Sequence, residues 1–529
     1  MADPIDFDRL LDAAQEYREA ARMAVAERLA ERSMDQEQRA AHGFAWIATS
    51  IAALEAVHAW LAAGPGRPVD VMVHELAFAE TLGQLIGGIP MGPGEIVRPS
   101  DLGLTGAADR VDQTAKAFLC TDRTTLRREI GALLADGRWP AEALDQDLDA
   151  MREQYRRFTE RRILSNAQRW HLANELVPDE TVAAMAELGT FGVCIPERFG
   201  GLGLSKMVMC VVTEELSRGW IGAGSLGTRS EIAGELIASG GTEEQKAHWL
   251  PRIASGEILP TAVFTEPDTG SDLGSLTTRA RRTANGWRID GSKTWITHAS
   301  RSDLMTLLVR TKPEQTGYAG LSMLLVPKSR GADAEPFPDK GLDGSEIGVL
   351  GYRGMREYSL SFDGMAAPSD ALLGGEEGQG FKQLMRTFEG ARIQTAARAV
   401  GVARRALELG LAYAKDRKQF GRAIIEFPRV SDKLASGLVD FVLARELTYA
   451  AAREKDSGRR CDIEAGMAKL LAARTAWTNA DAALQIHGGN GYALEFEISR
   501  ILVDARILSI FEGAAEIQAQ VIAKGLLTR

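Results

Sequence analysis

The stretch that decides the fold is residues 484–518, LQIHGGNGYALEFEISRILVDARILSIFEGAAEIQ, near the end of the chain. A glycine pair ends one helical pattern, a second helical pattern follows, and Glu512-Gly513 then stands between apolar residues just before a third. A carboxylate at the start of a helix is favoured by the helix dipole whatever its function. By itself, this segment leaves Glu512 open between a structural role and a chemical one.

The composition is typical of a globular protein with several domains. The chain has 529 residues, of which 45% are hydrophobic and 25% charged, and its formal net charge is -10. This acidic balance argues against a general nucleic-acid binder, although a local basic patch is compatible with it. The first residues, MADPIDFDRLLDAAQEY, lack the basic start and apolar core of a signal peptide, and no later run reaches transmembrane length. We expect a cytoplasmic protein without membrane insertion.

Residue spacing argues against several kinds of chemistry. The four cysteines have no CxxC spacing and the seven histidines form no HxxxH or HExxH pair, so we expect neither structural zinc nor a disulfide scaffold. No GxGxxG turn follows a strand, and neither a Walker phosphate loop nor a GxSxG motif occurs. Carboxylates, backbone amides and an organic cofactor remain as the means of catalysis.

The hydrophobic pattern divides the chain into helical and β-rich parts. Residues 5–260 have apolar positions at intervals of three and four, with breaks such as GGIPMGPGEIVRP. From residue 261, over about a hundred residues, β-branched and aromatic runs alternate with turn signals, among them Ala284-Asn285-Gly286 and Asp290-Gly291. Long helical patterns return after Gly380. The order predicts an α+β protein that ends in a helical bundle.

Three stretches, in this order, resemble the acyl-CoA dehydrogenase family of flavoproteins over residues 150–529. They are AVFTEPDTGSDLGSLTTRA with KTWIT, then AYAKDRKQFGRAIIEF, then residues 484–518. The resemblance implies an α-helical domain over residues 149–260, a middle β domain over 261–374 and a C-terminal four-helix bundle domain over 375–529. Residues 1–148 are then an N-terminal helical extension.

The resemblance also implies a reaction. In this family an acyl-CoA thioester is oxidised to the 2,3-enoyl thioester: a carboxylate removes the α-proton while the β-hydrogen leaves as hydride to N5 of FAD. Glu512 matches the family's base, and Gly513 lets the backbone pass close to the thioester substrate. The Glu512 backbone N–H and a ribityl hydroxyl are expected to stabilise the developing enolate. Electron-transferring flavoprotein is the implied electron acceptor.

Some family members carry the base on the helix that contains FEGARIQ, directly before its arginine. Here Ala391 occupies that position, before Arg392, and Glu389 lies two residues too early. Glu389 and Arg392 match positions on the substrate side. An i,i+3 ion pair on a helix surface is the structural alternative for these two residues.

FAD-binding residues follow from the same motifs. In the middle domain they are Phe264, Thr265, Ser271, Trp295 and Thr297, where Ser271 lies by the diphosphate or the substrate's pantetheine arm and Thr297 reaches N5. In the C-terminal domain they are Arg417, Gln419, Phe420 and Phe427, which reach FAD of a neighbouring subunit, together with Gln485, Gly488, Gly489, Ala514 and Glu516. The structural alternatives are a core aromatic for Trp295, a basic helix end for the DRKQFG element and a glycine helix break for Gly488-Gly489.

Two positions depart from the family pattern. Ala514 stands where the family usually has Thr or Asn after Glu-Gly, and Pro428 stands where it usually has Gln after Glu-Phe. Each replacement removes one polar contact that the family makes with FAD. We expect cofactor binding to survive both.

Arg229 carries the expectation about the substrate. It matches the arginine by which glutaryl-CoA dehydrogenases hold a distal carboxylate, a position without charge in members that act on fatty acyl groups. A buried unpaired guanidinium would be costly, so an acidic ligand is a physical reason for this arginine. The length of the N-terminal extension, with GLDGSEIGVLGYRGMREY before the last bundle, carries the family resemblance over the whole chain and implies (2S)-methylsuccinyl-CoA as the substrate and mesaconyl-CoA as the product. Methylsuccinyl-CoA is a short branched dicarboxyl thioester, which is consistent with Arg229. The structural alternative is a salt bridge to Glu231 or Glu235.

The extension bears on assembly. Gln84-Leu85-Ile86-Gly87-Gly88 resembles Gln485-Ile486-His487-Gly488-Gly489, so the extension echoes the C-terminal domain unless the match arose by chance. Such a domain would cover the face by which smaller members pair dimers into tetramers, and we expect a homodimer, with a homotetramer as the alternative. Alternative functions are a glutaryl-type or other short-chain dehydrogenase, an acyl-CoA oxidase, and a DNA-associated flavoprotein of the same superfamily.

Overall fold

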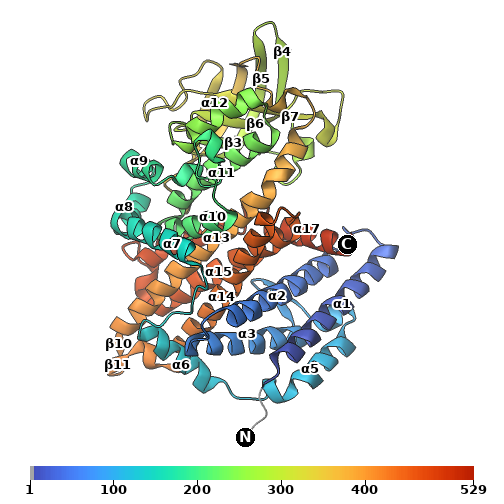
Figure 1. Cartoon of the computed structure of the whole chain (residues 1–529), viewed down its shortest axis with the longest axis vertical. Coiled ribbons are helices and arrows are strands. Elements are labelled where there is room, and N and C mark those ends of the chain that lie inside the picture. The colour runs from blue at the N-terminus through green and yellow to red at the C-terminus, as the bar shows by residue number, and fades with distance from the viewer. Residues whose placement is uncertain (1–4, 529) are drawn as a thin grey trace. The chain divides into compact units, whose positions relative to one another are not determined.

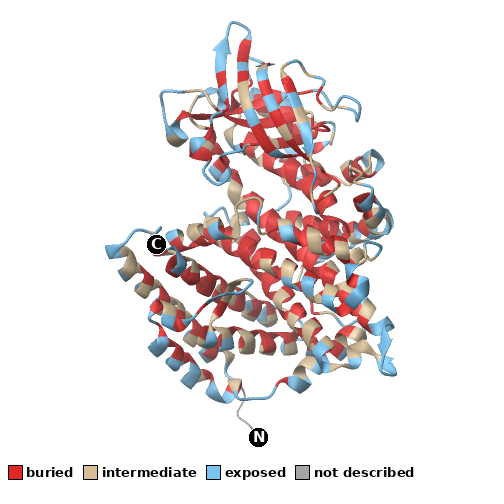
Figure 2. Cartoon of the chain, turned by 180° about the vertical axis from the view of Figure 1, so that it is seen from behind, coloured by how far each residue is buried: buried red, intermediate tan, exposed pale blue. Residues whose placement is uncertain are grey.

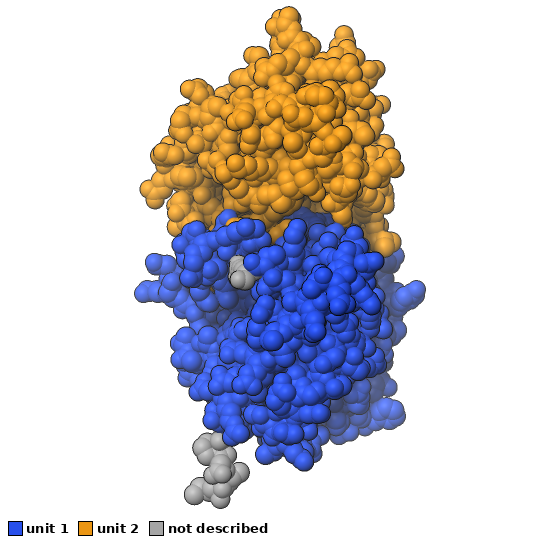
Figure 3. All heavy atoms as spheres, turned by 90° about the vertical axis from the view of Figure 1, so that its right-hand side faces the viewer, with its two compact units in different colours: residues 1–149, 395–529 blue, residues 150–394 orange. Residues whose placement is uncertain are grey.

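The computed structural model describes residues 5–528, and the chain divides into two compact units (Figure 3). The first unit consists of residues 1–149 and 395–529, and the second of residues 150–394. The N-terminal extension and the last helices thus belong to one unit, although the whole second unit lies between them in the sequence. Figure 1 follows the chain through its elements.

The extension is helical, as its periodicity predicts. Its elements are α1 (Phe7–Glu31), α2 (Gln38–Ala63), α3 (Pro68–Gly87), β1 (Ile89–Gly92), β2 (Glu95–Val97), α4 (Pro99–Leu102), α5 (Thr105–Leu119) and α6 (Thr124–Ala135). Asp6 caps α1 by accepting a hydrogen bond from the Arg9 backbone N–H over 3.0 Å. Pro68 opens α3, where its missing N–H has no helical partner to lose. The Gly/Pro-rich run after α3 forms the antiparallel hairpin β1–β2.

The C-terminal helices complete the first unit. They are α13 (Gly380–Asp416), which begins in the second unit and continues into the first, α14 (Pro428–Asp456), α15 (Asp462–His487), α16 (Glu497–Ile507) and α17 (Ala515–Thr528). Short elements join them: β10 (Lys418–Gln419), β11 (Arg422–Ala423), and the 3-10 turns η7 (Ile424–Glu426) and η8 (Gly488–Tyr492). α2 packs against α14 and α17, and α6 packs against α14 (Figure 1).

A buried network ties the extension to these helices. The carbonyl oxygen of Ala141 accepts hydrogen bonds from Trp60 Nε1 over 3.0 Å and from Arg445 Nη2 over 2.8 Å. The Ala141 N–H donates to Asp70 Oδ1 over 2.8 Å. These polar groups are buried, so an unpaired donor or acceptor among them would destabilise the packing of the extension against the C-terminal helices.

By length and composition, α2 is the one helix of residues 5–528 that would suit a membrane span, with a mean hydropathy of 1.4 over its most apolar window. The expectation that no run reaches transmembrane length is therefore wrong for α2. Of that window, 67% is buried inside the protein. The packing of α2 against α14 and α17 explains its apolar character, because a core helix is apolar on every buried side.

The second unit begins with helices. They are α7 (Gln146–Thr159), the π-helix η1 (Glu160–Leu164), α8 (Ser165–Leu172), α9 (Asp179–Glu187), α10 (Lys206–Gly219), α11 (Ile221–Gly240) and α12 (Glu243–Ala254), with the 3-10 turns η2 (Thr190–Gly192) and η3 (Glu197–Phe199). Thr242 and Gln245 form a capping box at the start of α12. α11 is buried along nearly its whole length, so its side chains face protein on every side.

A seven-stranded sheet follows, with the order β3-β6-β4-β5-β9-β8 and with β7 beside β6. Its strands are β3 (Pro260–Val263), β4 (Arg279–Thr283), β5 (Gly286–Thr297), β6 (Leu304–Arg310), β7 (Leu321–Pro327), β8 (Leu342–Ile347) and β9 (Glu357–Ala367), with the 3-10 turns η4 (Leu273–Ser275), η5 (Gly317–Gly320) and η6 (Leu373–Gly375). β6 runs parallel to β3 and β4, and the other pairs are antiparallel. Figure 2 shows buried and exposed residues along these strands. The α+β fold predicted from the sequence is confirmed.

One turn prediction is wrong. Ala284-Asn285-Gly286 does join β4 to β5, but Asp290-Gly291 lies inside β5, where the register against β9 shifts between Ile289 and Asp290. A Cβ on Gly291 would lie 2.7 Å from the backbone Cα of Thr278, so a glycine is needed there for close strand approach and not for a turn.

Candidate active site

Glu512 lies in the connection between α16 and α17 of the first unit. Its φ is 52° and that of Gly513 is 89°, so both residues adopt the left-handed region. Such strain in a residue other than glycine is uncommon and concentrates at functional sites. A Cβ on Gly513 would lie 2.2 Å from Nε2 of Gln518, which is buried and donates to the carbonyls of Glu512 and Gly513, each over 3.2 Å. Glycine is therefore required directly after Glu512.

Two side chains of α13 hold the Glu512 carboxylate. Arg398 Nη2 donates to Oε2 over 2.7 Å, and the Thr395 hydroxyl donates to the same oxygen. Arg398 also donates to Thr395 Oγ1 over 2.8 Å, and its guanidinium lies 4.7 Å from the centroid of the Phe511 ring. The Arg398 side chain is fully buried and that of Glu512 is 15% exposed, so water competes little for these charge-assisted bonds. The carboxylate is thereby held in one direction.

Arg398 and Thr395 were not predicted from the sequence. The available signal was an arginine inside the run of small apolar residues TAARAVGVA, residues 395–403, because a charge in such a run is buried only with a partner. That signal does not identify the partner, since Glu512 lies 114 residues further along the chain.

The rest of the connection is fixed from α15 and α17. Lys469, which is buried in α15, donates to the Gly513 carbonyl over 2.6 Å. The Ala514 carbonyl accepts the Gln518 N–H over 3.0 Å and so starts α17, while Glu516 is exposed in the first turn of that helix. Ala514 brings no side-chain donor or acceptor to this point, as its sequence departure predicts.

The DRKQFG element forms the small hairpin β10–β11. Phe420 and Gly421 make its turn with φ values of 49° and 79°, and Phe420 is 92% exposed. Its ring centroid lies 6.0 Å from that of Phe427. Arg417 and Gln419 are also exposed beside the turn. The hairpin thus exposes an aromatic ring and polar groups on the surface of the protein.

The other glycine pair ends α15. Gly488 has a φ of 58° and its N–H donates to the carbonyl of Gln485, which is an exposed residue. Nothing lies within 4 Å of a Cβ placed on Gly488 or Gly489. The backbone of this turn is therefore open to close approach by another group.

In the second unit, Phe264 and Thr265 follow β3 and are held from β5. Lys293 Nζ donates to the Phe264 carbonyl over 2.8 Å and to Glu266 Oε1 over 3.0 Å. The Thr294 N–H donates to the Thr265 carbonyl over 3.0 Å. Phe264 packs its side chain on the core between the sheet and α11–α12. These bonds place the two predicted FAD residues at the edge of β5.

The Lys293–Glu266 pair is buried, and its charges are unequally stabilised. Burial raises the pKa of Glu266, but the Lys293 ammonium and the hydrogen bonds from Thr277 and Thr278 outweigh it and lower that pKa to about 2. Burial lowers the pKa of Lys293 to about 8 despite the carboxylate beside it. Glu266 has several donors and Lys293 one anion, which accounts for the difference.

Trp295 and Thr297 lie at the end of β5 and differ in exposure. Trp295 has a φ of 58° and is 56% exposed, so it is not the core aromatic of the structural alternative. Thr297 is buried, and its hydroxyl donates to Glu357 Oε2 on β9 over 3.2 Å. Ser271 is exposed in the loop before η4. Glu357 was not predicted as a partner of Thr297, because the two residues meet only through the register of β5 against β9, which the sequence does not show.

Arg229 lies on α11 and is 8% exposed. Both carboxylates proposed as its structural partners, Glu231 and Glu235, accept from Lys206 at the start of α10, Glu235 Oε2 over 3.0 Å. Burial lowers the pKa of Lys206, but the two carboxylates outweigh it and raise that pKa well above its usual range. Glu231 and Glu235 thus each have a cation other than Arg229.

The substrate-side residues of FEGARIQ lie on α13 in the second unit. Arg392 is buried, with its guanidinium 5.7 Å from the Phe388 ring centroid, and Glu389 is half-buried. Ala391 is buried and occupies the alternative base position, so no carboxylate stands there. A Cβ on Gly390 would lie 2.4 Å from Glu235 Oε2, which brings α11 close to this helix.

The predicted residues form two sets, one in each unit, and both fit FAD. The exposed rings of Trp295 and Phe420 offer aromatic surface for a flavin ring and for adenine. The open backbone at Gly488-Gly489 permits close approach of a diphosphate. Among residues 5–528, no group of His, Cys, Asp and Glu is placed to hold a metal ion.

Three family models match consecutive parts of the chain. They are the acyl-CoA dehydrogenase N-terminal domain over residues 145–257, the middle domain over 261–365 and the C-terminal domain over 378–527. Residues 1–144 precede all three matches.

Individual relatives extend these matches. A (2S)-methylsuccinyl-CoA dehydrogenase of Cereibacter sphaeroides is 56% identical over 523 residues, 96% of this chain and 95% of the relative. Among solved structures, a chain from a study of the electron transferring flavoprotein of Acidaminococcus fermentans has a TM-score of 0.69 and 30% identity, covering 74% of this chain and 100% of its own. A glutaryl-CoA dehydrogenase from Mycobacterium smegmatis in complex with FADH2 has a TM-score of 0.67 and 28% identity, covering 73% and 96%.

Proposed function

Because the chain belongs to the acyl-CoA dehydrogenase family, we propose that it oxidises (2S)-methylsuccinyl-CoA to mesaconyl-CoA with Glu512 as the base. The enzyme is an oxidoreductase acting on a CH–CH bond, and FAD is the cofactor of its family. The observation that carries the substrate proposal is the likeness to the Cereibacter sphaeroides enzyme over 96% of the chain, extension included. The family models alone do not reach the first 144 residues.

Glu512 has the chemistry that the α-proton requires. A general base needs an acceptor atom fixed within reach of the proton that it removes. Arg398 and Thr395 fix the carboxylate, and Gly513 leaves the backbone beside it without a side chain. Glu512 takes the α-proton, the Cα–H electron pair forms the new double bond, and the β-hydrogen departs with its electron pair. Bound FAD supplies the acceptor for that hydride.

Each set of residues would contact FAD. Phe264, Thr265, Trp295 and Thr297 would contact the isoalloxazine ring, and Ser271 the diphosphate or the pantetheine arm. Arg417, Gln419, Phe420 and Phe427 would contact FAD of a second subunit, and Gln485, Gly488, Gly489, Ala514 and Glu516 would line its approach. The exposure of Trp295 and Phe420 supports these assignments, because both rings offer aromatic surface to another molecule.

Arg229 would bind the distal carboxylate of the substrate. The burial of the guanidinium supports this role, because a buried charge is stable only with an anion close to it. Arg392 and Glu389 would line the substrate side from α13. A buried guanidinium matched to a carboxylate selects a dicarboxyl thioester over an uncharged one of similar size.

We further propose electron-transferring flavoprotein as the electron acceptor, the cytoplasm as the location and a homodimer as the assembly. The exposed hairpin at Phe420 supports association of subunits. The extension packs on α14 and α17, and it would thereby limit the faces left for a homotetramer. We also propose four domains, over residues 1–148, 149–260, 261–374 and 375–529.

Anaerobic mixing of the purified yellow holoenzyme with a set of acyl-CoAs tests the function. Methylsuccinyl-CoA should bleach the flavin absorbance faster than glutaryl-CoA, butyryl-CoA or 2-methylbutyryl-CoA. Faster bleaching by an uncharged thioester would refute the dicarboxyl substrate, while bleaching by any of them would still agree with family membership. Rapid reoxidation by oxygen would favour an acyl-CoA oxidase, and salt-sensitive retention on DNA the DNA-associated branch.

A further inference from the structure

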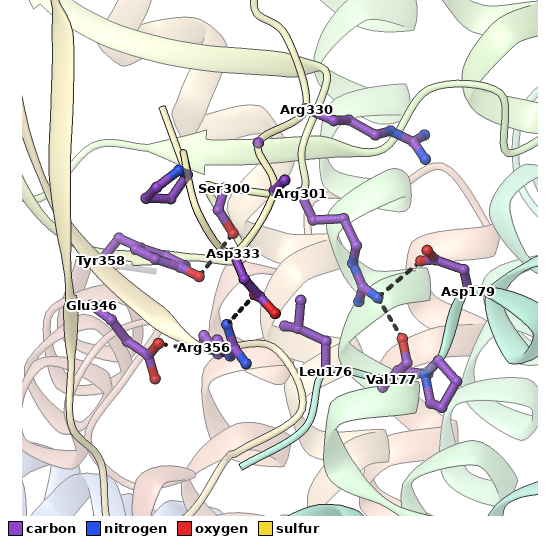
Figure 4. A pocket seen from close by; sticks show the side chains of 14 residues that line it. Leu176, Val177, Asp179, Ser300, Arg301, Arg330, Asp333, Glu346, Arg356 and Tyr358 are labelled. Atoms are coloured by element: carbon purple, nitrogen blue, oxygen red, sulfur yellow. Dashed lines mark hydrogen bonds and ion pairs between the residues drawn. The ribbon is translucent and has the colours of Figure 1, made fainter. Parts of the chain in front are cut away.

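A cavity of the second unit lies outside the residues assigned to the proposed reaction. Its volume is about 410 Å³ (Figure 4). Four separate segments line it: residues 176–179 at the start of α9, residues 300–301 after β5, residues 330–336 after β7, and residues 346–358 of β8, β9 and the connection between them. Figure 4 shows arginine side chains reaching it from three of these segments.

Arg301 is the buried cation of the cavity. Its side chain is 8% exposed. Nη1 donates to the Val177 carbonyl and lies 3.5 Å from Asp179 Oδ1, whereas Nε and Nη2 are buried without a hydrogen-bond partner. Buried donors are nearly always paired, and unpaired ones are costly. Two buried donors of Arg301, Nε and Nη2, are therefore left for an acceptor that comes from outside the protein.

Arg356 and two hydroxyl groups complete a polar wall. Arg356 Nη1 donates to Asp333 Oδ1 over 3.2 Å, and Nε lies 3.7 Å from Glu346 Oε2. The hydroxyls of Ser300 and Tyr358 are hydrogen-bonded to each other over 2.8 Å. A guanidinium next to hydroxyl donors is the combination that recognises phosphate and carboxylate oxygens.

The carboxylates that meet these arginines are solvent-exposed. The side chains of Asp179 and Asp333 are 88% and 91% exposed. Ion pairs to such exposed groups contribute little to stability, so an incoming anion can displace them at small cost. Arg330, by contrast, is committed to Asp303 by bonds of 2.6 and 2.8 Å and supplies positive charge at the rim.

The backbone around the cavity is strained. Asn174, His298 and Arg356 have φ values of 53°, 47° and 57°. They are joined to one another: the His298 N–H donates to the Arg356 carbonyl over 2.9 Å, and Arg356 Nη2 donates to the Asn174 carbonyl over 3.4 Å. Residues held in this region of backbone space concentrate at functional sites. The same feature marks Trp295, Phe420 and Glu512 in the proposed reaction.

We propose that this cavity binds a small ligand through an oxyanion, a phosphate or a carboxylate group. Arg301 and Arg356 are its cations, and Ser300 and Tyr358 its hydroxyl donors. In the absence of the ligand, Asp179 and Asp333 stand in as acceptors for the two arginines. A neighbouring cavity, which shares Pro178, adds Arg161, Arg162 and Arg169 to the positive surroundings.

Calorimetric titration of the full-length holoenzyme at constant ionic strength tests the site, with inorganic phosphate and succinate as separate probes. We expect saturable binding of at least one probe, and the probe that binds distinguishes a phosphate site from a carboxylate site. Absence of saturable binding of both probes to the wild-type protein would overturn the proposal.

Variants locate the binding. Tyr358→Phe removes one hydroxyl and should weaken binding about threefold to tenfold, and Arg356→Asn, which keeps a residue tolerant of positive φ, should weaken it by about tenfold or more. Asp179→Asn with Asp333→Asn should tighten it about twofold to fivefold, because the competing carboxylates are gone. Arg281→Gln, an exposed change on β4, is the control and should leave binding unchanged.

Two results would contradict the assignment. Wild-type affinity in both Tyr358→Phe and Arg356→Asn would place the bound anion elsewhere. Unchanged affinity in the double aspartate variant would refute the stand-in role of Asp179 and Asp333. Because both aspartates are exposed, that variant tests the proposal even where Arg356→Asn fails to fold.

Discussion

Arg398 and Glu512 form a charge pair of 2.7 Å across 114 residues of sequence, and the arginine side chain is fully buried. The pair determines where the carboxylate points, with Thr395 as a second donor to the same oxygen. Proton removal from carbon depends on that direction, because the acceptor must lie within hydrogen-bond reach of the proton. Arg398 is therefore a positioning residue for the proposed base.

The first prediction concerns Glu512 itself. Glu512→Gln should keep bound FAD and lose dehydrogenation by about 10²–10⁴-fold or more, because an amide cannot accept the α-proton. Flavin absorbance measures retention, and anaerobic bleaching measures the reaction. Glu495→Gln, an exposed neighbour, is the control. Activity within tenfold of wild type would remove Glu512 as the base and direct attention to Glu389.

The second prediction concerns its partner. Arg398→Met should lower kcat about 10- to 100-fold, because the Glu512 carboxylate is no longer held in one direction. KM should change little, because the groups that bind the substrate remain in place. Arg398→Lys should restore part of the activity, since it returns the charge without the planar fork. Arg386→Met, exposed on the same helix, should behave as wild type. Equal loss in the Lys and Met variants, together with a lower unfolding temperature in both, would indicate a purely structural arginine.

The third prediction separates a dicarboxyl substrate from an uncharged one. Arg229→Met keeps much of the stem volume but leaves the distal carboxylate unpaired, a loss of about 2–5 kcal/mol for one partner of a buried charge pair. The kcat/KM for methylsuccinyl-CoA should fall roughly a hundredfold or more, while that for butyryl-CoA should hold or rise. The ratio of the two values is the measurement. Equal losses on both substrates would assign Arg229 to support of α11.

The fourth prediction is a pH dependence of stability. Burial, with the positive charge of Arg301, lowers the pKa of His298 to about 3, against 6.5 for an unperturbed histidine. The unfolded chain then binds a proton that the folded chain does not, so this histidine lowers stability as pH falls from 6.5 toward 3. Between pH 7 and pH 5 the loss is about 2 kcal/mol.

His298→Asn tests this pH dependence, because Asn tolerates the positive φ of the position and does not titrate. Its unfolding free energy in urea should fall less than that of wild type between pH 7 and pH 5. His248→Gln, an exposed change, should preserve the wild-type slope. An unaltered slope in His298→Asn would show that the acid sensitivity of the protein lies elsewhere.

The fifth prediction concerns the extension. Deleting residues 1–148 should leave a flavoprotein core whose oligomeric state changes, because α14 and α17 lose the helix α2 that packs on them. Light scattering measures the mass, and flavin absorbance shows whether the core still binds FAD. An unchanged mass would show that the extension does not limit assembly. An insoluble product would show that the core depends on it.

The sequence by itself determined the α+β class, the family and the identity of the proposed base. These rest on local patterns: helical and strand periodicity, ordered motifs, and the Glu512-Gly513 pair before a helix. A local pattern gave a wrong prediction at Asp290-Gly291, because the same dipeptide suits a turn and a bulge and only pairing with β9 decides between them.

Only the tertiary structure decided which charges meet. It gave Glu512 the partner Arg398, gave Glu231 and Glu235 the partner Lys206, and gathered Arg301 and Arg356 around one cavity. It also placed the extension in one unit with the last helices. The physical reason is that ion pairing and hydrogen bonding act over a few ångströms through space, whereas separation along the chain sets no such distance.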